Sequence, residues 1–329
     1  MEIEGITYVV DSNTALMNWL TGVSGNDYTH VYIAPGRWSI DYSSIDSKKH
    51  LDDVSIGTKT IDGAPGSVIC DDNNDYFDTA DHEFGGILGY TTQPTKDCYI
   101  KNVSFEFSKA LTYTPSDGEF SILYNCINII NCNVSAVQTH STGSAPLACA
   151  WKCINIFNCT FSTGYSSAVV SGQNHIDSIA YCKNIANCIF NIINDAQNYA
   201  DEDSSFYFVD SCANISDCVV YGNLINNTEW SALGEGTNIF SGCTNINNIM
   251  IYNESITGYG ACDACVDISN VVAKEFTRCK GMSHCCGFSI DQWGYMYMAA
   301  ASFSNCYADH GTTNAVANTA AGGYNWVTT

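Results

Sequence analysis

The stretch Cys126-Ile127-Asn128-Ile129-Ile130-Asn131-Cys132-Asn133-Val134 decides the fold, because its frame recurs along the chain. Three more copies, with Asn or Asp at the second Asn position and Val or Phe at the end, begin at Cys153, Cys182 and Cys212. A fifth copy begins at Cys243 and has Ile249 in place of the second Cys. The starts are 27, 29, 30 and 31 residues apart. Such a period is typical of stacked supersecondary units.

The aligned copies form columns of similar residues. An apolar residue precedes the first Cys by three positions in each copy: Leu123, Ala150, Ile179, Val209 and Phe240. Ile follows it by three positions in each copy: Ile129, Ile156, Ile185, Ile215 and Ile246. The second Cys and the residue two beyond it alternate inward as in a strand. We therefore predict that the members of each column lie directly above one another in the core, one on each coil.

One polar column interrupts this apolar pattern. Asn stands two residues after the first Cys of each copy: Asn128, Asn155, Asn184, Asn214 and Asn245. Asn tolerates a left-handed backbone and can hydrogen-bond to its copies above and below, so this column predicts a tight turn at every level. The chain is predicted to coil.

The segments between the copies separate two architectures. Leucine-rich repeats have a similar period but need a helix or an equivalent return. The segments 191–210 and 221–242 are rich in Asn, Gly, Ser and Asp and lack a 3.6-residue periodicity, which favours strands and loops. We therefore predict an all-β fold, a β-solenoid. A Ser/Asn start followed by apolar spacing up to Leu20 predicts a short N-terminal capping helix.

The N-terminal part carries further signals. A strand is expected over 29–34, then a turn at Pro35-Gly36 and another strand, and the chain turns again at glycines within 59–69. The segments VYIAPGRW (31–38), IDGAPGSVI (61–69) and NIFNCTF (155–161) resemble the pectin lyase-like superfamily. This resemblance covers most of the chain and implies a right-handed parallel β-helix. It does not settle the chemistry, because that superfamily includes lyases, hydrolases, epimerases, phage tailspikes and adhesins.

The chain is expected to form one continuous domain. We assign 1–96 to an N-terminal cap and first coils, 97–314 to the β-helix repeats and 315–329 to a C-terminal cap or tail. Both Cys265 and Cys279 fit the frame, but the 14 residues between them look too few for a coil beside neighbours twice as long. We therefore expect one of the two to belong to an insertion.

Composition excludes several classes of protein. Lys and Arg number 12 against 34 Asp and Glu, so the formal net charge of -22 disfavours a nucleic-acid partner. No stretch approaches the ~18 apolar residues of a membrane span, and residues 1–5 lack the basic start of a secretion signal. No membrane insertion is expected.

The 18 Cys allow two interpretations. Stacked thiols suit a solenoid core, whereas a disulfide scaffold needs Cβ directions that a parallel stack does not automatically supply. Core thiols are favoured, and they favour folding in a reducing compartment. A single CxxC, Cys262 to Cys265, is too little to predict zinc, so no metal is expected, although calcium could bind acidic loops.

Candidate chemistry lies in two loops that are expected on adjacent coils. The motif sets that the resemblance would require of a pectate lyase or a galacturonase are absent. A hydrolase of another type would need two carboxylates, and we select Asp203, Glu229 and Glu235 as candidate catalytic residues. The candidate ligand-binding residues, which could stack on sugar rings, are Tyr199, Phe206 and Trp230. The alternative is a solvated acidic loop pair or a calcium site.

Three functions remain open. The first is a non-catalytic carbohydrate-binding or host-attachment protein, a phage tail or bacterial surface component that binds a polysaccharide or cell-surface glycan. The second is a polysaccharide hydrolase using the acidic loops, and the third is a structural filament or spike shaft. The first implies a virion, extracellular or cell-surface location, and a homotrimer is an oligomeric state common among tailspike-like helices.

Overall fold

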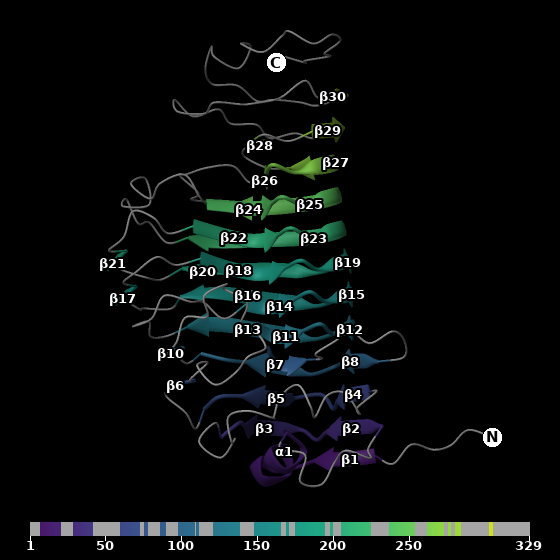
Figure 1. The fold of residues 1–329 in the computed structure, drawn as a ribbon, viewed down its shortest axis with the longest axis vertical. Helices are drawn as coiled ribbons and strands as arrows, with labels where there is room; N and C mark the ends of the chain where they lie inside the picture. Colours follow the sequence, from purple (N-terminus) through teal and green to yellow (C-terminus); the bar gives the residue numbers. More distant parts are fainter. Residues whose placement is uncertain are drawn as a thin grey trace, which may run out of the picture.

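The structure is a computed structural model. It describes residues 7–20, 29–41, 60–72, 76–77, 86–89, 98–108, 110–111, 121–138, 148–165, 169–170, 175–194, 198–199, 205–224, 237–253, 262–272, 276–277, 280–283 and 303–304. Within these residues the protein is a parallel β-solenoid, in which successive coils lie on top of one another (Figure 1). Every strand pairing in the described residues is parallel.

Two long sheets form the walls of the solenoid. The first wall has eight strands: β7 (Gly86–Gly89), β11 (Ser121–Tyr124), β14 (Ala148–Trp151), β18 (His175–Ala180), β22 (Ser205–Asp210), β24 (Thr237–Ser241), β26 (Cys262–Asp263) and β28 (Phe276–Thr277).

The second wall contributes up to two consecutive strands to each coil. Its eighteen strands are β1 (Thr7–Val10), β2 (His30–Ile33), β3 (Gly36–Ser39), β4 (Thr60–Gly63), β5 (Ser67–Cys70), β8 (Tyr99–Lys101), β9 (Ser104–Glu106), β12 (Ile127–Ile130), β13 (Asn133–Gln138), β15 (Ile154–Phe157), β16 (Thr160–Tyr165), β19 (Lys183–Ala186), β20 (Ile189–Asn194), β23 (Ala213–Leu224), β25 (Thr244–Asn253), β27 (Val266–Val272), β29 (Lys280–Ser283) and β30 (Phe303–Ser304). Two small parallel pairs lie outside the walls: β6 (Tyr76–Phe77) with β10 (Ala110–Leu111), and β17 (Val169–Val170) with β21 (Asn198–Tyr199).

The helix α1 (Asn13–Leu20) lies at the N-terminal end of the stack (Figure 1). The Ser12 hydroxyl accepts a hydrogen bond from the Ala15 N–H at 3.1 Å, which caps the first turn. Leu16, Trp19 and Leu20 are buried. The predicted capping helix is confirmed, and its apolar face joins the core formed by the first strands.

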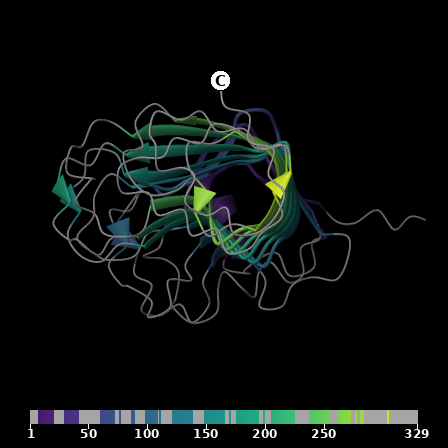
Figure 2. The same cartoon turned by 90° about the horizontal axis from the view of Figure 1, so that it is seen from above.

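A bend at every third residue carries the chain from the first wall onto the second and then from one strand of the second wall to the next. In one coil Asn125, Asn128 and Asn131 have φ values of 52°, 53° and 54°, and the inward residues between them, such as Cys126 and Ile129, are buried. The same three bends recur on each of the next five coils, up to Ala264, Asp267 and Asn270, and these coils eclipse one another when seen from above (Figure 2). The sequence predicted one turn column, at Asn128, where the structure has three.

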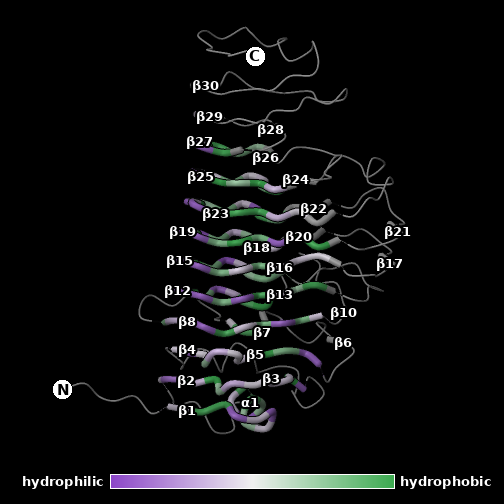
Figure 3. Tube along the Cα trace, turned by 180° about the vertical axis from the view of Figure 1, so that it is seen from behind, coloured by the Kyte–Doolittle hydropathy of each residue, from purple (hydrophilic) through white to green (hydrophobic). Residues whose placement is uncertain are grey.

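The predicted Asn column forms a continuous hydrogen-bonded ladder. Asn155 donates from Nδ2 to Oδ1 of Asn128 at 2.9 Å, and the next three donors, Asn184, Asn214 and Asn245, repeat the contact at 2.9, 2.8 and 2.9 Å. Each amide therefore joins two coils. Figure 3 shows the hydrophilic residues of this corner at the same place on successive coils.

The predicted core columns are confirmed. Leu123, Ala150, Ile179, Val209 and Phe240 pair in register on the first wall. Ile129, Ile156, Ile185, Ile215 and Ile246 pair in register on the second wall. The return segments are strands such as β18 and β22, and α1 is the one helix in the described residues, so the leucine-rich alternative is wrong.

The expected insertion between Cys265 and Cys279 is also wrong. Val266 pairs with Lys280 and Ile268 with Met282 on one wall, while Cys262 pairs with Phe276 on the other. From 266 to 280 the chain therefore completes a full coil in 14 residues. A coil needs only one strand on each wall, and the extra length of other coils lies in the segments between the walls.

The second wall is one sheet from β1 to β30, so the first strands and the repeats share it. The boundaries at 96 and 314 remain predictions, and 315–329 lies outside the described residues. In the described residues, no helix has the length and apolar character needed to cross a membrane.

Candidate ligand-binding face

The outward side of the second wall carries two adjacent columns of side chains, which we call the outer strip. Along β20, Phe190 and Ile192 point into the core, whereas Ile189 and Asn191 point outward. In-register pairing repeats this arrangement on each coil. The outer strip consists of Asn133, Thr160, Ile189, Val219 and Met250 in one column and Ser135, Ser162, Asn191, Tyr221 and Tyr252 in the other.

The C-terminal end of the outer strip is apolar and aromatic. The rings of Tyr221 and Tyr252 stack with centroids 5.4 Å apart and planes 12° from parallel. Both tyrosines remain about half exposed, at 46% and 49%, and Met250 beside them is exposed at 46%. The Tyr252 hydroxyl donates to the Met250 sulfur at 3.9 Å. The two coils thus present a fixed aromatic pair to solvent.

The N-terminal end of the outer strip is polar. Asn191 donates from Nδ2 to the Ser162 hydroxyl at 3.2 Å, and Asn133 donates to the Ser104 hydroxyl at 3.4 Å. All the side chains that form the strip are uncharged. Tyrosine hydroxyls, serine hydroxyls and an amide can donate and accept hydrogen bonds, and the rings and aliphatic groups offer apolar contact. The strip is therefore suited to binding, and it contains no carboxylate or imidazole for acid–base chemistry.

Most of the site residues selected from the sequence lie outside the described residues: Asp203, Glu229, Trp230 and Glu235. Tyr199 lies in β21, where it pairs with Val170, and Phe206 lies in β22, where it pairs with Ile176 and Thr237. Only the backbone is described for these two residues, so their proposed stacking on sugar rings stays a prediction. The strands that flank the two acidic loops do pair, β20 with β23 and β22 with β24, so the loops leave adjacent coils.

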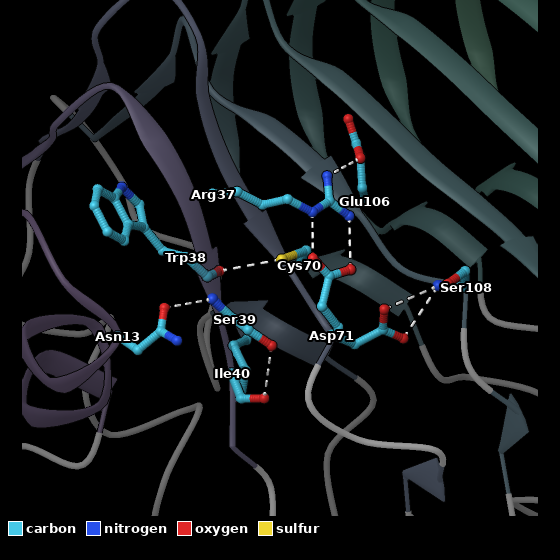
Figure 4. A network of polar contacts seen from close by, with 10 residues as sticks. Asn13, Arg37, Trp38, Ser39, Ile40, Cys70, Asp71, Glu106 and Ser108 are labelled. Atoms are coloured by element: carbon cyan, nitrogen blue, oxygen red, sulfur yellow. Dashed lines mark hydrogen bonds and ion pairs between the residues drawn. The ribbon is translucent and has the colours of Figure 1, made fainter.

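A charged network, which the sequence did not reveal, ties three coils together near the N-terminal end (Figure 4). The Arg37 guanidinium on β3 binds the carboxylates of Asp72 and Glu106, and these contacts raise the pKa of Arg37. Asp71 accepts hydrogen bonds from the Ser108 N–H at 3.1 and 3.2 Å. Because the Arg37 guanidinium binds carboxylates from two other coils at once, this network is suited to holding coils together.

The cysteines are structural in the described residues. All fourteen described Cys are free and buried: Cys70, Cys98, Cys126, Cys132, Cys149, Cys153, Cys159, Cys182, Cys188, Cys212, Cys218, Cys243, Cys262 and Cys265. The interpretation as core thiols is confirmed for them. No group of three or more His, Cys, Asp or Glu that could hold a metal ion occurs among the side chains that the structure describes.

The sequence contained a signal for the tyrosine pair that was not used. Tyr221 and Tyr252 each follow the first Cys of their copy by nine residues, from 212 to 221 and from 243 to 252. Each tyrosine also lies three residues after the buried second Cys position, Cys218 or Ile249. Because side chains alternate along a strand, this odd spacing places both tyrosines on the outward side.

The chain matches no protein-family model, no curated protein and no solved structure.

Proposed function

We propose that this protein is a non-catalytic attachment protein that binds a glycan on its outer strip, as a phage tail or bacterial surface component of the pectin lyase-like superfamily. The observation that carries the proposal is the exposed, stacked pair Tyr221 and Tyr252. The proposal places the protein on a virion or a cell surface.

The chemistry of the strip supports a sugar ligand. Tyrosine offers a rigid apolar surface with a polar tip, and it loses little conformational entropy on binding. Here each ring is already held by its neighbour, so less freedom remains to be lost. Sugars combine hydroxyl groups with C–H surfaces, which match the hydroxyls, the Asn191 amide and the ring edges of the strip.

The test is glycan binding by the full chain, first on a glycan array and then by calorimetry with the best ligand. Tyr221→Ala and Tyr252→Ala are each expected to weaken binding about tenfold, which corresponds to about 1.4 kcal/mol. The matched control is Tyr32→Ala, since Tyr32 is also exposed, at 40%, but lies on β2. Absence of glycan binding, or equal binding by all three variants, would contradict the proposal.

A hydrolase is the second candidate, because the two acidic loops leave paired strands on adjacent coils. This candidate uses Asp203, Glu229 and Glu235. It predicts new reducing ends when a polysaccharide is incubated with the protein, and their loss in Glu229→Gln or Asp203→Asn. Binding without products from any of the glycans bound on the array would reject the hydrolase and leave the attachment function in place.

A further inference from the structure

Two columns of buried thiols run through the frame-bearing coils. The first thiol column contains Cys126, Cys153, Cys182, Cys212, Cys243 and Cys265. The second thiol column contains Cys132, Cys159, Cys188 and Cys218. None of these ten residues is more than 1% exposed. Consecutive members lie directly before or within strands that pair on adjacent coils, so each thiol has another thiol of its column on a neighbouring coil.

The thiol protons take part in the hydrogen bonding of the coil. The Cys182 thiol lies 3.3 Å from the carbonyl oxygen of Ala180 and 3.8 Å from that of Ala150 on the preceding coil. Cys212 donates in the same way to Asp210 at 3.1 Å and to Ile179 at 3.9 Å. A disulfide has no S–H to donate, so the observed arrangement requires the reduced form of each cysteine.

We propose that these two columns make folding of the chain depend on a reducing environment, while the folded protein resists the same oxidants. In the unfolded chain two thiols would react with the disulfide of oxidised glutathione. The first thiolate attacks a glutathione sulfur and releases one reduced glutathione, and the second thiol displaces the other, losing its proton. The chain gains one disulfide and is oxidised by two electrons, and two reduced glutathione molecules are released.

Burial separates the two states. In the folded protein all ten column thiols are shielded from solvent, so an oxidant as large as glutathione does not reach them. Burial also raises the pKa of Cys182 and Cys212, which disfavours the attacking thiolate at these two positions. In the unfolded chain all 18 Cys are accessible and can pair in many wrong ways. Any such disulfide that involves a column member removes its S–H hydrogen-bond donor. It also links two segments of the chain that must move independently to reach their places in the stack.

The experiment uses the full chain with Cys279, Cys285, Cys286 and Cys306, which lie outside the described residues, replaced by Ser. Folded protein is incubated with oxidised glutathione, and its free thiols are then counted with Ellman's reagent in denaturant. In parallel, reduced protein is refolded from urea in oxidised or in reduced glutathione. We expect an unchanged thiol count in the folded sample, and a several-fold lower yield of β-sheet signal on refolding in oxidised glutathione, restored by dithiothreitol.

The chain itself supplies a matched control for the second thiol column. The equivalent position holds Val103 on one side of that column and Ile249 and Val271 on the other. Replacing the four Cys of the second column with Val should preserve folding in reduced glutathione and lessen the loss of yield in oxidised glutathione. Undiminished sensitivity of a folded Val variant would overturn the proposal. If that variant does not fold, the protein with only the four Ser replacements still tests the proposal. Equal refolding yields in both glutathione buffers, or loss of thiols from the folded protein as fast as from the unfolded chain, would overturn the proposal.

Discussion

The first coils, from β2 to β9, and the frame coils, from β12 to β25, stack with the same parallel register but are joined by different kinds of exposed polar side chain. In the first coils Arg37 bridges Asp72 and Glu106, and Lys101 binds Asp62 at 2.9 Å. In the frame coils the corner is joined by neutral amides, each about 2.9 Å from the next.

The difference shows what a repeated stack requires of its side chains. An amide both donates and accepts hydrogen bonds, so the same residue can occupy this position on every coil and bind its equivalents above and below, as in the Asn ladder. A charged side chain cannot stack on its own copy, so the first coils alternate Arg and Lys with acids. The ion pairs are also exposed, which weakens them and makes them salt-dependent.

The largest expected effect concerns the interior that both regions share. Phe161 is fully buried and its ring stacks on that of Phe190 at a centroid distance of 5.6 Å. Phe161→Ala should lower the free energy of unfolding by about 3 to 5 kcal/mol, because it removes buried ring surface and leaves a cavity. Phe157→Ala, at an exposed position of the same coil, should change it by less than about 0.5 kcal/mol.

Urea titration followed by circular dichroism measures both variants, and Phe105→Ala extends the comparison to the first coils. Phe105 is 1% exposed, so its loss should be of similar size. Equal midpoints for Phe161→Ala and Phe157→Ala would contradict the assigned core. A separate early transition in Phe105→Ala would show that the first coils unfold on their own.

The second effect is the pH dependence of stability that the buried thiol of Cys149 causes inside the frame coils. Burial raises the pKa of Cys149 from 9.0 to about 11, and the thiol lies 3.2 Å from the Thr163 hydroxyl. Below pH 9 the thiol is protonated in both states. Above it the unfolded chain loses the proton first, so stability falls as the pH rises from 9 to about 11.

Over that range the wild type should lose about 2 to 3 kcal/mol more than Cys149→Ala, which has no thiol at this position to titrate. Thermal or urea unfolding at intervals between the two pH values provides the measurement. Parallel stability curves for the two proteins would refute the assignment of a buried, neutral thiol at this position.

The third effect tests the amide ladder directly. Asn184 has a φ of 58°, accepts from Asn214 and donates to Asn155. Asn184→Ala should cost about 2 kcal/mol, since it removes two hydrogen bonds and leaves a Cβ residue without local side-chain support in a left-handed conformation. Asn184→Gly removes the same hydrogen bonds but allows the positive φ without strain, so it should lower the free energy of unfolding by only about 1 kcal/mol. A loss at Gly equal to that at Ala would mean that the φ value contributes nothing.

The sequence predicted the ladder and the core columns because identical residues recur in identical environments. It did not predict the first of the three bend columns. That column holds Asn125, Lys152, Tyr181, Ser211, Gly242 and Ala264, yet all six have φ between 49° and 59°. No shared residue type marks this position, so the neighbouring coils impose the conformation there against local preference.

The outer strip was not predicted from the sequence for a related reason. The column that ends in Tyr221 and Tyr252 begins with Ser135 and Ser162, so its members share only an outward direction. Outward positions on a strand are less constrained by packing, so this column keeps no common residue type, and only the shared offset of Tyr221 and Tyr252 from the first Cys marks it. The 14-residue coil escaped prediction because loop length does not enter the register of the walls.

The smallest expected effect returns to the difference between the ion pairs of the first coils and the amides of the frame coils. Arg37→Gln should lower the free energy of unfolding by at most about 1 kcal/mol, because its side chain and those of its partners are 44 to 46% exposed. Unfolding with urea, which adds no ions, should show this loss shrink at about 1 M salt, where the Debye length is only about 3 Å. The loss in Asn184→Ala should stay the same at both salt concentrations, because neutral amides are not screened. If salt weakens the two variants' effects equally, the ladder and the ion pairs hold the coils by the same means, and the contrast between the two regions is lost.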